Sequence, residues 1–117
     1  NAPAILAELV DKSRHYQTGQ MAHVVNLSLL PHTPEDLDWL AEALGEGAVT
    51  ILSRGYGNCR VTACAQPHVW KVQFYNSMDT LILDTYEVCD MPEVALAAAE
   101  DLADSAIRIR DVIGAMQ

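Results

Sequence analysis

Three segments in the second half of the chain restrict the fold more than any other feature of the sequence. They cover residues 59–65, 68–75 and 80–88, and short turns separate them. From Trp70 to Phe74, apolar and polar residues alternate, which is typical of a strand with one buried face. Because consecutive strands joined by short turns pair with each other, we expect an antiparallel meander of three strands.

A strand–helix–strand unit is predicted upstream of the meander. The strands are expected over 23–30 and 48–53, and the helix over 34–44, with Thr33 as N-cap and Pro34 in the first turn. A helical crossover normally joins parallel strands in a right-handed unit. The sequence therefore predicts a βαβ unit whose two strands are parallel.

Two further helices are expected, over 3–16 and from Pro92 to about Ala115. The second has one apolar seam with steps of three and four residues: Ala95, Ala99, Leu102, Ala106, Ile109 and Ile113. We expect this seam to cover the sheet, and a homodimer through the 95–113 seam is the alternative.

The complete pattern indicates one α+β domain over 1–117. Its mixed five-stranded sheet would combine the βαβ unit with the antiparallel meander, and the N-terminal, crossover and long C-terminal helices would pack on it.

Charge composition limits the partners. The 117 residues contain 7 basic and 16 acidic side chains, for a net charge of −9. This balance argues against nucleic acid and against an anionic membrane surface. An apolar run of about 18 residues, as needed to cross a bilayer, is not found, so no membrane insertion is expected. An acidic chain with a local basic spot suits a protein partner better.

The turn between the expected strands over 48–53 and 59–65 is the strongest candidate for a partner-binding surface. It is formed by Ser53, Arg54, Gly55, Tyr56, Gly57, Asn58, Cys59 and Arg60. The glycines permit a shaped backbone, and the arginines and the tyrosine supply forked donors and an amphipathic ring. An ordinary turn with surface arginines is the alternative.

No catalytic, metal or cofactor site is predicted. The three cysteines show no CxxC spacing, and Cys59 and Cys64 would lie on opposite faces of one strand. The glycines of the turn lead into a strand, so they do not form a phosphate site at a helix N-terminus. These observations favour a binding or assembly domain over an enzyme.

The motif over 53–60 also resembles that of a known family. With the stretches 23–27, 34–37, 69–77 and 100–105, the chain is similar to the C-terminal domain of the HupH/HyaF hydrogenase expression proteins. Full-length members are longer, so the resemblance implies that an N-terminal part is missing here.

The resemblance implies a cytoplasmic accessory protein that acts in maturation of [NiFe]-hydrogenase. It would act as a chaperone of the iron–sulfur small-subunit precursor before export, with other maturation proteins as further partners. Only the matched motif, Ser53 to Arg60, is transferred as a functional surface. The alternative is a redox or iron–sulfur handling protein that uses Cys59, whose thiolate Arg54 and Arg60 would stabilise.

Overall fold

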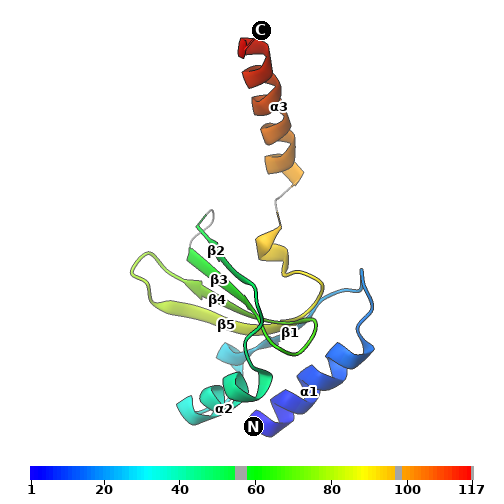
Figure 1. The fold of residues 1–117 in the computed structure, drawn as a ribbon. Coiled ribbons are helices and arrows are strands. Elements are labelled where there is room, and N and C mark those ends of the chain that lie inside the picture. The colour runs from blue at the N-terminus through cyan, green and yellow to red at the C-terminus, as the bar shows by residue number, and fades with distance from the viewer. Residues whose placement is uncertain (55–57, 97–98, 117) are drawn as a thin grey trace.

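The computed structural model describes residues 1–54, 58–96 and 99–116, with the side chains of 99–101 left aside, and these residues form a five-stranded sheet and three α-helices (Figure 1). In chain order the elements are α1 (Ala2–His15), β1 (His23–Asn26), η1 (Leu27–Leu29), α2 (Pro34–Leu44), β2 (Thr50–Ser53), β3 (Asn58–Ala63), β4 (Val69–Tyr75), β5 (Leu81–Val88), η2 (Glu93–Ala95) and α3 (Ala99–Met116). The predicted α+β class and its five strands are confirmed.

The sheet has the strand order β1-β5-β4-β3-β2, and every neighbouring pair is antiparallel. The meander of β3, β4 and β5 is therefore confirmed, but the mixed sheet with a parallel βαβ unit is wrong. The strands β1 and β2 lie at opposite edges, because β1 pairs with β5, with Val25 opposite Tyr86. Strand β1 ends at Asn26 and not at residue 30 as expected. The Asn26 side chain accepts a hydrogen bond from the Ser28 backbone N–H (2.9 Å) and caps η1.

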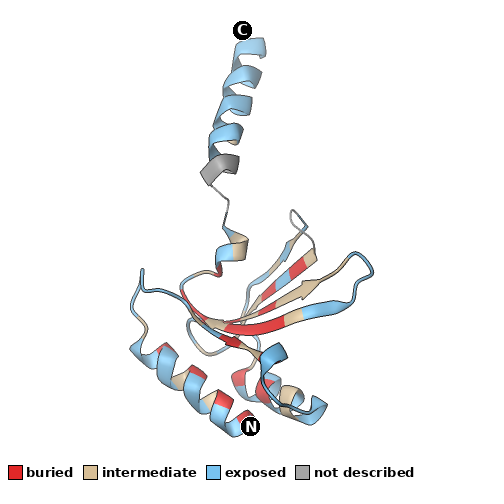
Figure 2. Cartoon of the chain, turned by 180° about the vertical axis from the view of Figure 1, so that it is seen from behind, coloured by how far each residue is buried: buried red, intermediate tan, exposed pale blue. Residues whose placement is uncertain are grey.

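Helices α1 and α2 cover one face of the sheet (Figure 2). The buried side chains of this first core are Ala2, Ile5 and Leu9 from α1, Leu40 and Leu44 from α2, and Val25, Leu27, Val69, Tyr86 and Val88 from the sheet side. On the sheet side, this core combines side chains of β1 and η1 with side chains of β4 and β5. The pairing of β1 with β5 brings these side chains together.

The start of α2 has the capping box that the sequence indicates. The Thr33 hydroxyl oxygen accepts a hydrogen bond from the Asp36 backbone N–H (3.2 Å), and the Asp36 carboxylate accepts one from the Thr33 backbone N–H (3.0 Å). That N–H holds the pKa of the Asp36 carboxyl below its ordinary value of 3.8. The lowered pKa means that the box is intact at neutral pH and is lost only as the pH falls through the folded-state pKa.

Replacement of the cap, Thr33→Ala, is expected to lower the free energy of unfolding by about 1 kcal/mol, because one N–H of the first turn loses its acceptor. Denaturant unfolding measures the change. The control Glu42→Ala, at an exposed position of the same helix, should change it by less than about 0.5 kcal/mol. Equal effects of the two variants would contradict a stabilising role for the cap.

The second face of the sheet has its own core, which the residues after β5 cover. Val61, Trp70 and Val72 are buried there against Cys89, Met91 and Val94. The Trp70 indole N–H donates a hydrogen bond to the Cys89 carbonyl oxygen (3.2 Å). Among the described residues, the apolar centre of each face of the sheet is therefore covered by elements other than α3.

Helix α3 stands away from the sheet (Figures 1 and 2), so the prediction that it packs on the sheet is wrong. Leu102, Ile109 and Ile113 of the predicted seam are 60%, 58% and 53% exposed. The physical reason is that the segment from Cys89 to Val94 already occupies the apolar face that the helix was expected to cover. The described part of the chain has no helix that is both long and apolar enough to cross a membrane.

Candidate functional site

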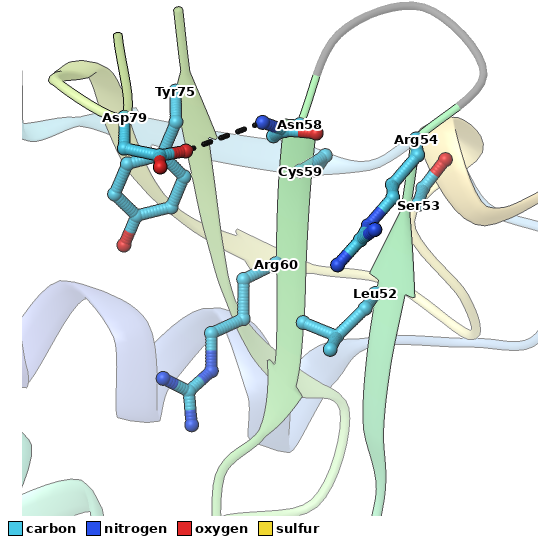
Figure 3. Close-up of a pocket in the computed structure, with 8 residues that line it drawn as sticks. All are labelled: Leu52, Ser53, Arg54, Asn58, Cys59, Arg60, Tyr75 and Asp79. Carbon is cyan, nitrogen blue, oxygen red and sulfur yellow. Dashed lines mark hydrogen bonds between the residues drawn. The ribbon is translucent and has the colours of Figure 1, made fainter. Parts of the chain in front are cut away.

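A hollow of about 310 Å³ lies at the end of the sheet where β2 leads toward β3 (Figure 3). It is lined by Leu52, Ser53, Arg54, Asn58, Cys59, Arg60, Tyr75 and Asp79. Five of the predicted site residues thus lie together here: Ser53, Arg54, Asn58, Cys59 and Arg60. The other three, Gly55, Tyr56 and Gly57, are outside the described residues.

Strand pairing places these side chains. Leu52 lies opposite Arg60 in the β2–β3 pair, and Asn58 lies opposite Tyr75 in the β3–β4 pair. Because side chains alternate along a strand, Arg60 shares a face with Leu52 and Tyr75, whereas Cys59 points to the other face. Figure 3 shows Arg60 and Tyr75 extending from neighbouring strands beside the hollow. The open face therefore presents a guanidinium, an aromatic ring and an apolar side chain side by side.

The turn between β4 and β5 forms the second rim of the hollow. Its Asn76 side-chain oxygen accepts hydrogen bonds from the backbone N–H groups of Met78 (2.8 Å) and Thr80 (3.0 Å). Asp79 has a φ of +59°, a left-handed conformation that Asp tolerates better than most residues. The Asn58 amide donates to the Asp79 carboxylate (3.3 Å), which joins the start of β3 to this turn.

The two arginines carry most of the available binding chemistry. Ion pairs in the described part of the chain are His15–Asp11, His23–Glu8 and Lys71–Asp84, so neither Arg54 nor Arg60 has a described carboxylate within 4.0 Å. A guanidinium can bind a carboxylate with two parallel hydrogen bonds or bind backbone carbonyl oxygens. The hollow is thus suited to an extended or acidic segment of a partner.

Sequence reasoning missed Leu52, Tyr75 and Asp79, which the structure adds to the site. The sequence contained a signal for Tyr75 and Asp79. In an antiparallel meander, alternate turns lie at the same end of the sheet, so the turn after Tyr75 had to lie near the glycine turn.

The thiol of Cys59 does not have the character that the redox alternative requires. Its side chain is 5% exposed, and burial, with the Glu87 carboxylate as the second cause, raises its pKa above the ordinary 9.0. Arg60 lies on the opposite face of β3 and does not offset these effects. Burial likewise raises the pKa of Cys64 to about 11 and that of Cys89 to about 12. The argument that nearby arginines stabilise a Cys59 thiolate is therefore wrong.

Alkylation by iodoacetamide tests this character of Cys59. We expect slow labelling near pH 6 and a rate that climbs with pH without levelling off by pH 9.0, because the raised pKa keeps most of the thiol protonated over this range. Peptide mapping by mass spectrometry separates Cys59 from the other two cysteines. The guanidinium-unfolded chain is the control and should label all three at the rate of a free thiol. Fast labelling of the folded chain near pH 6 would contradict the assignment.

Within residues 1–54, 58–96 and 99–116, no group of three or more His, Cys, Asp or Glu side chains converges in a way that could hold a metal ion. The accessible chemistry of the hollow is instead that of hydrogen-bond donors and an aromatic ring.

The fold and the hollow together define a small α+β domain with a hollow lined by arginine and tyrosine side chains. The chain belongs to the family described as the HupH hydrogenase expression protein, C-terminal conserved region, whose model matches residues 1–116. The predicted family is therefore confirmed.

Individual relatives agree with this family. The chain is 70% identical to the hydrogenase expression/formation protein HupH of Rhodobacter capsulatus, over 100% of the chain and 42% of that protein. It is 39% identical to the hydrogenase-1 operon protein HyaF of Escherichia coli K12, over 77% of the chain and 32% of that protein. The chain thus spans about two fifths of the length of the curated relatives it matches most extensively.

A solved structure has the same fold. It is that of the hydrogenase expression protein HupH from Thiobacillus denitrificans, with 28% identity and a TM-score of 0.89 over 97% of this chain and 95% of that chain. The three-helix, five-strand arrangement is therefore shared with a relative of low sequence identity.

Proposed function

We propose that this chain acts in hydrogenase maturation as the C-terminal domain of an accessory protein, and that it binds the precursor of the iron–sulfur small subunit before export. The names of the relatives, hydrogenase expression/formation proteins, support the maturation role. Binding before export places the encounter in the cytoplasm, where other maturation proteins are further candidate partners.

The observation that carries the proposal is the hollow at the end of β2 and β3. It combines Arg54, Arg60 and Tyr75, residue types that supply most of the binding energy at protein interfaces. Leu52, 68% exposed beside Arg60, adds apolar surface that a partner can cover. A precursor segment with a carboxylate or free backbone carbonyls next to an apolar side chain would complement this arrangement.

The charge of the chain supports a directed encounter. Arg54 and Arg60 form a local basic spot on a chain with a net charge of −9. An acidic partner segment would be repelled by most of the surface and attracted at the hollow, which favours one orientation of binding. Such steering weakens as salt screens charges beyond about 10 Å.

Co-purification with a tagged small-subunit precursor tests the proposal. We expect the wild-type chain to be captured at low salt and captured less as the salt concentration rises. The matched control is the tagged large subunit of the same hydrogenase, which should not capture the chain. Absence of capture by the precursor, or equal capture by both subunits, would contradict the proposed binding.

A further inference from the structure

Strand β2 lies at one edge of the sheet and is paired on one side only. It pairs with β3, and among the described residues the strand order places no strand on its other side (Figure 1). Its sequence is Thr-Ile-Leu-Ser, without a proline or a charged side chain. Proteins commonly place such residues on edges that stay free, because open backbone groups at an edge can pair with another chain. The β2 edge is therefore suited to pairing.

The register shows which backbone groups of β2 point away from β3. The Ala63 N–H donates a hydrogen bond to the Val49 carbonyl oxygen (2.9 Å), so these two residues form a hydrogen-bonded pair. Hydrogen-bonded and non-hydrogen-bonded pairs alternate along an antiparallel ladder. Thr50 and Leu52 are therefore in the non-hydrogen-bonded pairs of the β2–β3 ladder. Their N–H and C=O groups point out of the edge of the sheet.

These outward groups are open to an added strand. In residues 1–54, 58–96 and 99–116, the backbone hydrogen bonds outside the helices and strand ladders include none from Thr50 or Leu52. The Leu52 side chain is 68% exposed, and Thr50 is also exposed. Each of the two residues can exchange a pair of hydrogen bonds with a residue of a strand laid beside β2, as in recognition by strand addition.

The β2 edge runs directly into the hollow at the end of β2 and β3. Leu52, Ser53 and Arg54 line that hollow, whereas the residues of β1, the strand at the other edge of the sheet, do not. Continuity with the candidate binding surface distinguishes the β2 edge from the β1 edge. A strand added to β2 would have one end at the hollow.

Charge indicates the chemistry of the added strand. Arg54 directly follows β2 and is exposed, with no described carboxylate within 4.0 Å. Asp79, the acidic side chain among the described residues that line the hollow, lies across β3 from Arg54 and accepts the hydrogen bond from Asn58 (Figure 3). A carboxylate on the added strand would therefore meet a guanidinium that can bind it. Strand β2 contains no acidic residue, so β2 of a second copy supplies no such carboxylate.

We propose that an extended segment of the small-subunit precursor binds as an added strand along β2, with an acidic side chain at Arg54. This binding mode rests on the proposed function, because its occupant is the precursor named there. The backbone groups of Thr50 and Leu52 hold the segment whatever its sequence. The side chains of Leu52 and Arg54 select a segment in which a carboxylate lies near an apolar residue.

Hydrogen exchange of single amides, followed by nuclear magnetic resonance, tests the added strand. In the free chain, the amides of Thr50 and Leu52 are expected to exchange faster than those of Ile51 and Ser53, which face β3. With the tagged small-subunit precursor bound, exchange at Thr50 and Leu52 should slow at least about tenfold. The amide of Val24, on the edge strand β1, is the control and should not change.

The outcomes separate the binding mode from the function on which it rests. Precursor binding without protection of Thr50 and Leu52 would overturn the added strand and leave the proposed function standing. Absence of precursor binding would overturn the proposed function itself, and the added strand with it. Slow exchange of both amides in the free chain would also overturn the added strand, because the edge would then already be paired.

A proline at position 52 gives an independent test. The β2–β3 ladder does not use the Leu52 N–H, and proline is tolerated on an edge strand where its nitrogen faces outward. Leu52→Pro should therefore keep its fold, as circular dichroism can verify. The control Leu52→Ala removes the side chain but keeps the N–H. Capture of the precursor should be at least about fivefold weaker for Leu52→Pro than for Leu52→Ala, because proline also removes a backbone donor.

Equal capture by the two folded variants would overturn pairing through this N–H. The exchange measurement uses the wild-type chain, so it decides the matter even if Leu52→Pro does not fold.

Discussion

Capture of the small-subunit precursor is expected to fall about tenfold to a hundredfold when Arg54 and Arg60 are both replaced by alanine. Each guanidinium lies at the hollow without a described carboxylate within 4.0 Å, and is therefore available to a partner. Truncation of both arginines is expected to cost roughly 1.4–2.8 kcal/mol together, since about 1.4 kcal/mol corresponds to a factor of ten. Calorimetric titration of the precursor measures the loss directly.

The control removes the same charge elsewhere. Lys12→Ala with Arg14→Ala takes two positive charges from α1, whose side chains do not line the hollow. This control should reduce affinity only through the change in net charge, and that small effect should vanish at high salt. If the Arg54 and Arg60 variant binds as well as the control, the precursor does not use this hollow.

The stability of the fold is expected to depend most on Trp70. Its side chain is 9% exposed in the second core, and its indole N–H donates to the Cys89 carbonyl oxygen (3.2 Å). Trp70→Ala leaves a large cavity and an unpaired buried carbonyl, so the free energy of unfolding should fall by about 3–5 kcal/mol. Such a loss is a large share of the roughly 5–15 kcal/mol that stabilises a typical domain.

The second tryptophan gives a matched control. Trp39, on α2, is 44% exposed and has no described hydrogen bond from its indole N–H, so Trp39→Ala should cost about 1 kcal/mol or less. Denaturant unfolding followed by circular dichroism compares the two, because this backbone signal does not depend on which tryptophan remains. Similar losses for both would show that the second core does not depend on the Trp70 contact.

Local signals predicted most of the secondary structure. Thr33 and Asp36 marked the start of α2, and the alternation around Trp70 marked a strand of the meander, because caps and period-two patterns depend on nearby residues. The pairing of β1 and the position of α3 were not predictable in this way. Whether β1 pairs with β2 or with β5 depends on which core its side chains complete. No local feature of the sequence specifies that pairing.

The part of the candidate site that depends on local sequence was predicted, and the part that depends on strand pairing was not. Arg54 and Arg60 flank a turn that the sequence makes conspicuous, whereas Tyr75 and Asp79 join them through strand pairing. The thiolate that the redox alternative assigned to Cys59 was wrong because neighbours in sequence were treated as neighbours in space. Along a strand, adjacent residues point to opposite faces, so Arg60 is remote from the thiol.

The hydrogen bond between Asn58 and Asp79 affects how the sheet fluctuates. It connects the beginning of β3 with the turn that follows β4, so the ends of two hairpins are linked across β4. Local opening of a protein proceeds in cooperative units rather than residue by residue. This link favours joint opening of the start of β3 and the turn between β4 and β5, the two parts of the hollow that it connects.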